Sequence, residues 1–253
     1  ASRSDDVLTA PCDPSTLPGG YGENKGRRMT HPAKAFWSER TEPFGRTSSN
    51  ASLFRFFGHG GFDFTGKAVL EVGFGFGADL LEAGRRGADI HGVDISSQAV
   101  ESMIARTGLD TFRQGDPSRD PISFSRTFDA IYCRDTIYYF TDGEIAAFAR
   151  HCRAALAPGG VLVVQFIEGN YRRTVEDAAS VEPVRWGEWK RIDGVFHPDN
   201  PIRILDPEVV VRLIARAGLD LVGKKTLWET YGIREEIMQS NRYLMFRPVD
   251  GAG

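Results

Sequence analysis

A carboxylate stands just ahead of alternating glycines, in the part of this sequence best suited to chemistry. The apolar segment 67–72 contains Glu71, and Gly73, Gly75 and Gly77 follow it directly. A short apolar run of this kind predicts a buried strand, and the glycines predict a turn where backbone approaches a ligand closely. A helix beginning after the turn directs its first N–H groups at the same ligand. The segment therefore predicts a nucleotide-like cofactor at a strand-to-helix turn.

Two cofactors compete for such a turn. Gly73, Gly75 and Ala78 formally fit the dinucleotide pattern, and Asp94 stands about twenty residues after Gly73, where a ribose-binding acid is expected. S-adenosylmethionine (SAM) instead carries an amino-acid end with a free ammonium group. Glu71 can neutralise that ammonium, whereas it would repel the phosphates of a dinucleotide. The position of Glu71 therefore favours SAM.

Two more acids follow predicted strands. Segment 88–94 predicts a second strand that ends in Asp94, whose carboxylate can accept hydrogen bonds from a ribose diol. Segment 110–116 predicts a third strand that ends in Asp116, which can accept from an adenine amino group. Because open parallel sheets bind ligands at the carboxyl edge of their strands, we expect Glu71, Asp94 and Asp116 along one edge.

The helix between these two strands is expected to begin at Ser96 or Ser97, since either serine can cap it. Val100, Ile104 and Thr107 follow at helical spacing and predict the face that packs against the sheet.

The order of these motifs resembles a class I SAM-dependent methyltransferase of the small-molecule type over residues 67–167. Segment 69–77 resembles the glycine-rich first motif of that family, and 93–96 resembles its ribose-binding acid and helix start. Segment 128–140 resembles the fourth strand and the loop that flanks the methyl group, and 156–164 resembles the turn into the fifth strand. The resemblance implies an α/β fold, Rossmann-like, with a seven-stranded mostly parallel sheet, helices on both faces and an antiparallel terminal strand.

The same resemblance implies a set of cofactor contacts on the first four strands and the loops that follow them: Glu71, Gly73, Gly75, Asp94, Ile95, Asp116, Cys133 and Arg134. The family often has a histidine in the loop after the fourth strand. This chain has Tyr138 and Tyr139 there, so a family-style base is not carried over directly.

Two segments outside these motifs are predicted to cover the site, within a single domain over residues 1–253. In the N-terminal cap segment 1–60, Trp37 and Arg40 resemble residues that close the methionine end of the cofactor in some relatives. Packing of Trp37 onto the core is the open alternative. The insertion 168–205 leaves the fifth strand at the ligand edge and is predicted to be a lid over the acceptor. A surface hairpin or a dimer contact stays open for it.

The insertion contributes aromatic residues and one histidine to the predicted acceptor pocket: Tyr171, Trp186, Trp189, Phe196 and His197.

Other helices and strands are predicted from local signals. Thr141 and Glu144 form a capping-box pattern, and Ile145, Phe148, Cys152 and Leu156 would then share one helical face. Further elements are expected as helices at 48–57, before a loop with His59, and from Pro207 to near Gly218, and as an antiparallel strand pair at 219–227 and 241–247.

The predicted reaction is an in-line displacement at the sulfonium methyl, for which the protein mainly aligns the reactants in a dry site. A general base is needed only when the acceptor is protonated at the working pH. Tyr139 and His197 are the catalytic candidates, and His31 and Glu168 are further candidates. No His, Cys or acid grouping has metal-ligand spacing, so no metal is predicted.

Composition is that of an ordinary globular domain. The chain has 253 residues, 41% of them hydrophobic, and a net charge of −3, so no global field attracts nucleic acid or an anionic membrane. No apolar run is long enough for a membrane span, and the first residues lack the apolar region of a signal peptide. Cys12, Cys133 and Cys152 have no paired spacing. Reduced thiols and a cytoplasmic location are expected.

The function predicted on these grounds is methyl transfer from SAM to an O, N, S or C nucleophile of a small-molecule metabolite. Two alternatives stay open: a non-catalytic SAM-binding protein and an NAD(P)-dependent oxidoreductase. A homodimer is also left open.

Overall fold

The computed structural model describes residues 32–39, 48–172, 189–190, 202–231 and 237–249. The chain divides into residues 1–30 and residues 31–253, and every described residue belongs to the second part. The predictions for His31, Arg40, Trp186, Phe196 and His197 fall outside the described residues.

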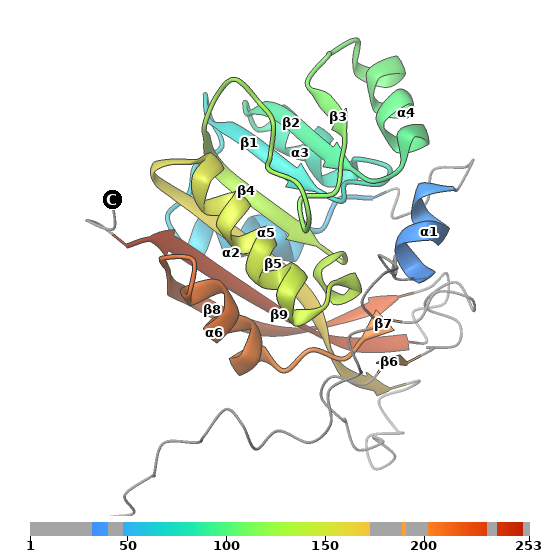
Figure 1. Cartoon of the computed structure of the whole chain (residues 1–253). Coiled ribbons are helices and arrows are strands. Elements are labelled where there is room, and N and C mark those ends of the chain that lie inside the picture. Colours follow the sequence, from blue (N-terminus) through green and yellow to red (C-terminus); the bar gives the residue numbers. More distant parts are fainter. Residues whose placement is uncertain (1–31, 40–47, 173–188, 191–201, 232–236, 250–253) are drawn as a thin grey trace, which may run out of the picture. The chain divides into compact units, whose positions relative to one another are not determined.

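Seven strands of the described chain form one sheet in the order β3-β2-β1-β4-β5-β9-β8. The neighbours from β3 to β5 are parallel, while β9 is antiparallel to both β5 and β8 (Figure 1). Their bounds are β1 Ala68–Val72, β2 Asp89–Asp94, β3 Phe112–Gln114, β4 Phe128–Arg134, β5 Leu156–Arg172, β8 Leu219–Tyr231 and β9 Ile237–Pro248. The predicted fold class, with an antiparallel terminal strand, is confirmed.

Helices cover both faces of the sheet. One face packs against α5 (Asp142–Ala155) and α6 (Pro207–Ala215), which lie in front of the sheet in Figure 1. The other face packs against α2 (Ala51–His59), α3 (Ala78–Arg85) and α4 (Ser97–Thr107). Because side chains alternate along a strand, Leu70 and Val72 face α5, whereas Val69 and Glu71 face α2 and α3.

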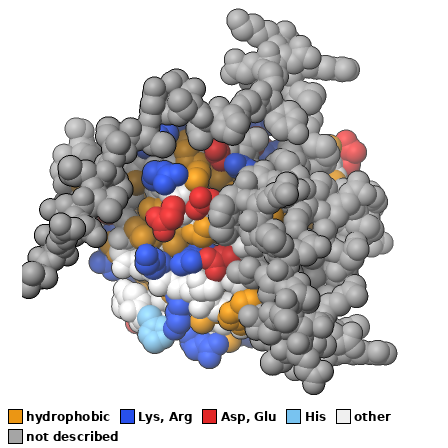
Figure 2. Space-filling model, turned by 90° about the horizontal axis from the view of Figure 1, so that it is seen from below, with side chains coloured by type: hydrophobic (Ala, Val, Ile, Leu, Met, Phe, Trp, Pro, Cys, Tyr) orange, Lys and Arg blue, Asp and Glu red, His pale blue; other side chains and the backbone are white. Residues whose placement is uncertain are grey.

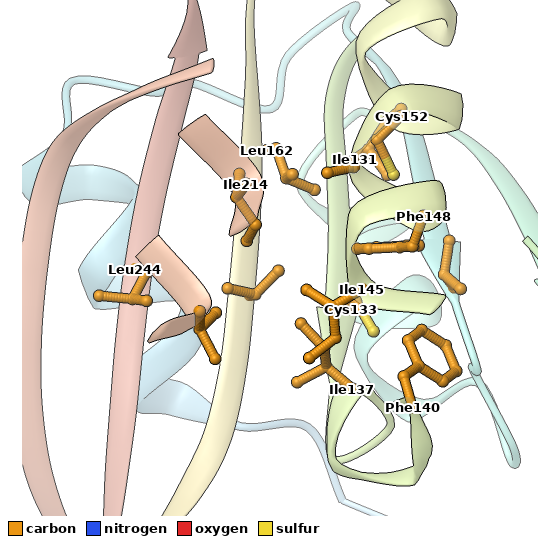
Figure 3. Packing of buried hydrophobic residues seen from close by; sticks show 14 of the residues in the cluster. Ile131, Cys133, Ile137, Phe140, Ile145, Phe148, Cys152, Leu162, Ile214 and Leu244 are labelled. Carbon is orange, nitrogen blue, oxygen red and sulfur yellow. The ribbon is translucent and has the colours of Figure 1, made fainter. Parts of the chain in front are cut away.

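Figure 3 shows the core under α5 and α6. Ile145, Phe148 and Cys152 of α5 point at Ile131 of β4 and Leu162 of β5. The predicted apolar face is confirmed for these three residues, whereas Leu156 lies beyond the end of α5 and begins β5. Thr141 caps α5 and accepts from the Glu144 backbone N–H, while the Glu144 side chain accepts from the Thr141 N–H. The predicted capping box is therefore also confirmed.

Some local predictions were wrong in detail. On α4 the buried residues are Ala99, Val100 and Met103, while Ile104 is 39% exposed. The buried face is rotated because Met103 fills the space above Gly77, where a Cβ would lie 2.3 Å from the Met103 sulfur. His59 is the last residue of α2 rather than a loop residue.

Strand lengths also differ from the prediction. Strand β3 is only three residues long and ends before Asp116, while β5, β8 and β9 extend beyond their apolar centres. Their added length comes from antiparallel pairing, which local apolar patterns do not report. Within the predicted insertion, β6 (Trp189–Lys190) pairs with β7 (Ile202–Arg203).

Candidate cofactor site

The glycine turn after β1 depends on backbone conformations that other residues rarely adopt. Gly73, Gly75 and Gly77 have φ values of 75°, 51° and 69°. Gly77 is the left-handed N-cap of α3. Gly73 also has no room for a side chain, because a Cβ there would lie 2.2 Å from the Thr136 hydroxyl oxygen. The turn thus packs against the residue pair that follows β4, and Gly73 and Gly75 remain half-buried.

Replacing Gly73 with alanine is expected to lower the free energy of unfolding by more than replacing Gly66. Both glycines have positive φ, 75° and 69°, so both substitutions strain the backbone by about 1–2 kcal/mol. Only Gly73→Ala also drives a methyl group into Thr136, since nothing lies within 4 Å of the corresponding position at Gly66. Urea denaturation of both variants measures the difference. Equal losses would show that the contact with Thr136 relaxes freely.

Glu71 lies in a buried group of charges. Its carboxylate accepts from the Tyr132 hydroxyl at 3.1 Å, across the β1–β4 pair that places these residues side by side. Arg134 donates to Asp79 at 2.5 Å and to Asp135 at 3.0 Å. Within the described part of the chain, the salt bridges of Arg134 go to these two acids and none forms with Glu71. Three carboxylates thus surround one guanidinium.

This charge excess shifts the titration of the group. Burial, reinforced by the nearby charge of Asp79, raises the pKa of Glu71 well above its usual value. Burial and the neighbouring Glu71 also raise the pKa of Tyr132. Burial would lower the pKa of Arg134, but Asp79 and Asp135 raise it, so the guanidinium stays charged. A cationic ligand next to Glu71 would restore the ionised carboxylate.

Asp94 ties the end of β2 to the glycine turn. One carboxylate oxygen accepts from the Gly75 N–H at 2.9 Å, and the other accepts from the Ser96 N–H at 2.9 Å. Burial raises its pKa, against the lowering effect of these backbone donors. Ser96 caps α4 as predicted, and Ile95 lies half-buried between the two residues. The structure therefore brings the predicted ribose acid to the glycine turn.

Asp116 lies past the end of β3, and its carboxylate forms a salt bridge with Lys34 at 2.8 Å. Lys34 belongs to α1 (Pro32–Ser38), so the N-terminal segment contacts the acid predicted for the adenine. Ser118 donates to the other oxygen from its backbone at 3.1 Å and from its hydroxyl at 2.6 Å.

The aromatic residues after β4 pack under α1. Trp37 lies with its ring centre 5.9 Å from that of Tyr139, which packs edge-on against Tyr138 at 4.7 Å. Tyr138 and Tyr139 form the short 3-10 helix η2 (Ile137–Tyr139) and are buried. Trp37 thus packs onto the core and also reaches the loop that the resemblance places near the methyl group.

Cys133 lies at the end of β4, and its side chain belongs to the core beneath α5. Burial raises the pKa of this thiol. Because Cys133 points away from the Glu71 side of the sheet, only its backbone is left for a cofactor.

Glu168, a further candidate for the base, accepts from Ser240 at 2.8 Å and from Arg242 at 2.7 Å. Both of its oxygens are thus engaged on the neighbouring strand β9.

Four residues near the site were missed by sequence reasoning. Asp79 accepts from the Asn50 N–H at 2.7 Å, and Gln165 accepts from the Asp135 N–H at 3.0 Å. The place of Asp79 in the first turn of the helix after the glycines was an available signal. Lys34, Asn50 and Gln165 contact the site through pairings distant in sequence, for which a single sequence holds no signal.

A hollow of about 390 Å³ lies away from this site, between α2, β8 and β9. It is lined by Phe56, His59, Gly60, Val222, Gly223, Lys224, Lys225, Met245 and Arg247. Lys and Arg side chains lie next to a histidine on the face that Figure 2 shows. None of the predicted cofactor residues lines this hollow, so the convergence of strand ends, and not the hollow, defines the candidate site.

The described part of the chain holds no group of three or more His, Cys, Asp and Glu side chains that could bind a metal ion. No helix among the described residues is both long enough and apolar enough to cross a membrane.

Part of this chain is similar in sequence to a known protein family and to named enzymes. Residues 69–160 match the family described as Methyltransferase domain. The ubiquinone biosynthesis O-methyltransferase of Psychrobacter cryohalolentis is 32% identical over 111 residues, which are 42% of this chain and 42% of that protein. That of Cupriavidus pinatubonensis is 24% identical and covers 70% of this chain and 69% of its own length. The match thus spans less than half of the length of that first relative.

Solved structures share the fold. The glycopeptide N-methyltransferase MtfA complexed with SAM has a TM-score of 0.55 and 19% identity, covering 78% of this chain and 94% of its own. A structure described as "Conversion of a Disulfide Bond into a Thioacetal Group during Echinomycin Biosynthesis" has a TM-score of 0.60 and 18% identity, covering 85% and 87%. At these identities the likeness shows the fold alone.

Proposed function

We propose that this chain, whose residues 69–160 match the family described as Methyltransferase domain, transfers the methyl group of SAM to a small-molecule nucleophile. The observation that carries the proposal is the group of carboxylates at the buried Glu71 and Asp79 and the half-buried Asp135 with one guanidinium, beside a glycine turn with left-handed backbone. An α-ammonium group is the ligand chemistry that such a site stabilises. A dinucleotide phosphate at the same place would meet like charge.

The proposed contacts follow the sheet edge. Glu71 accepts from the ammonium, Asp94 accepts from the ribose hydroxyls, and Asp116 accepts from the adenine amino group. Asp94 and Asp116 fit these roles because each carboxylate oxygen can accept more than one hydrogen bond. Ile95 and the Cys133 backbone would flank the adenosine, while Arg134 keeps Asp79 and Asp135 in place beside the methionine end.

SAM supplies a methyl group already activated by its sulfonium, so the chain's own task is binding, orientation and exclusion of water. Trp37 and Tyr139 are proposed to cover the reacting end, because their rings pack against each other at a tilt of 60° and place apolar surface over the loop after β4. The insertion 168–205 and Arg40 would complete this cover. For a protonated acceptor we propose Tyr139 or His197 as the base, with His31 as a further candidate. An oxygen nucleophile is the first to test, since the sequence relatives are named O-methyltransferases.

S-adenosylhomocysteine, the demethylated product of SAM, is expected to raise the melting temperature, whereas NAD and NADP leave it unchanged. At a concentration of about 100 times its Kd, the product adds about 2.7 kcal/mol to the free energy of unfolding. For a domain of this size the melting temperature then rises by roughly 5–10 °C. Differential scanning fluorimetry with each ligand measures the shift.

Stabilisation by a nicotinamide cofactor and none by S-adenosylhomocysteine would contradict the proposal. Binding of the product without methyl transfer to any acceptor in a small-molecule panel would favour the non-catalytic SAM-binding protein. Gel filtration of the same samples tests for a homodimer.

A further inference from the structure

Lys34 lies at the predicted adenine end of the site, and its ammonium group has three oxygen partners. Its ammonium lies 2.8 Å from Asp116, 2.7 Å from Glu144 and 2.5 Å from the Ser118 hydroxyl. The residue is only 5% exposed, and its ammonium also lies 5.1 Å from the centre of the Phe140 ring. A lysine this buried is retained only when its charge is paired and hydrogen-bonded.

The number of hydrogen-bond partners limits which further contacts Lys34 can make. An ammonium group has three N–H donors, and three oxygen atoms accept them here. Lys34 therefore has no donor left for an adenine ring. Its effect on a cofactor must pass through Asp116, whose orientation it holds from one side while Ser118 holds the other oxygen.

Asp116 keeps acceptor capacity despite these contacts. Lys34 occupies one carboxylate oxygen, and the two donors of Ser118 occupy the other. Because a carboxylate offers about four lone-pair sites, one site remains for an external donor. Arg119 is the next cation, with its Nε 3.6 Å from Asp116 and 3.2 Å from Glu144. Without Lys34, Arg119 would draw Asp116 away from its present orientation.

The same helix reaches the other part of the site. One turn after Lys34, Trp37 packs against Tyr139. Docking of α1 therefore depends on the ion pairs of Lys34 at one end and on the aromatic contact at the other. A ligand donor that fixes Asp116 would also favour the docked position of α1, and a docked α1 would favour that ligand.

We propose that Lys34 is a positioning residue, which orients Asp116 toward the adenine amino group and so couples adenine recognition to docking of α1. The inference rests on the proposed function and specifies which part of the cofactor α1 helps to recognise. Lys34 acts without touching the cofactor.

The test compares S-adenosylhomocysteine with S-inosylhomocysteine, whose base carries a carbonyl oxygen in place of the amino group. The native protein is expected to prefer the adenosine compound, since a carbonyl oxygen faces Asp116 with like polarity. Lys34→Met is expected to weaken binding of S-adenosylhomocysteine about tenfold, as when a hydrogen bond to a charged group loses its geometry. Affinity for the inosine compound should change by less than about twofold, so the ratio of the two affinities should be smaller in the variant than in the native protein. Isothermal titration calorimetry measures both affinities.

Glu144→Gln is the matched control, because it removes the negative charge of another Lys34 partner and leaves the Lys34–Asp116 pair in place. This variant should lose stability yet keep the native preference for adenosine. Lys34→Met with an unchanged preference would overturn the inference, since a purely structural lysine lowers both affinities together.

Hydrogen exchange on the native protein gives a measurement that does not depend on the variant folding. Addition of S-adenosylhomocysteine should slow exchange of the amides in residues 32–39, and unchanged exchange despite saturating ligand would overturn the coupling. A native protein that binds neither compound would instead overturn the proposed function, and this inference with it.

Discussion

Replacing Glu71 with glutamine is expected to make the ligand-free protein more stable and, at the same time, to weaken SAM binding. Glu71 is buried, bonded to Tyr132, and next to the negative charge of Asp79. Glutamine keeps the shape and an acceptor oxygen but removes the charge that the site leaves uncompensated. The loss of one charge-assisted hydrogen bond to the ammonium corresponds to about 1.5–3 kcal/mol, or roughly 10- to 100-fold in affinity.

The stability gain of Glu71→Gln should depend on pH. The pKa of Glu71 in the folded protein is raised above its usual 4.5, so the unfolded chain ionises first. Between the unfolded and folded pKa values the folded state holds the extra proton, and native stability therefore falls as pH rises. The variant lacks this fall, so its advantage grows above about pH 4.5. Affinity of the native protein for SAM should rise over the same range, because the ammonium favours the ionised carboxylate.

Urea denaturation at several pH values and calorimetric titration with SAM measure the two effects. Glu82→Gln is the matched control, since Glu82 lies on α3 and pairs with Arg85 and Arg86 at the surface. If Glu71→Gln lost stability and kept its SAM affinity, Glu71 would be a structural carboxylate and the ammonium would bind elsewhere.

Replacing Asp94 with alanine should cost more SAM affinity than the loss of ribose hydrogen bonds alone. The carboxylate also accepts from Gly75 and Ser96, so its removal releases the glycine turn and the start of α4 together. We expect a loss of about 3 kcal/mol or more, on the order of 100-fold in Kd. Asp94→Asn keeps one acceptor oxygen, so its affinity for SAM should lie between those of the alanine variant and the native protein.

Calorimetry with S-adenosylhomocysteine measures this series, and Asp110→Ala serves as the control at an exposed acid beside β3. Circular dichroism establishes that each variant is folded. A folded Asp94→Ala protein with native affinity would place the ribose away from β2.

Features that depend on neighbouring residues could be predicted from the sequence. The capping box of Thr141 and Glu144 forms as expected, because both partners lie within one helical turn. The glycine turn, the strand before Gly73 and the strand that ends in Asp94 were likewise predicted. Hydrophobic periodicity, turn residues and helix caps all depend on residues that lie a few positions apart. The order of these motifs also predicted the parallel part of the sheet and the methyltransferase family whose model matches residues 69–160.

The tertiary structure decided which side chains meet. Lys34 and Asp116 are 82 positions apart, and Asp79 and Arg134 are 55 positions apart, so no local pattern pairs them. The sheet also decided that Cys133 faces the core while Tyr132 faces Glu71, because alternation along β4 puts adjacent residues on opposite faces. On α4, packing of Met103 over Gly77 determined the buried face, and Ile104 was left exposed. The sequence by itself therefore determined the elements and the cofactor turn, and long-range packing and burial determined the charge balance around them.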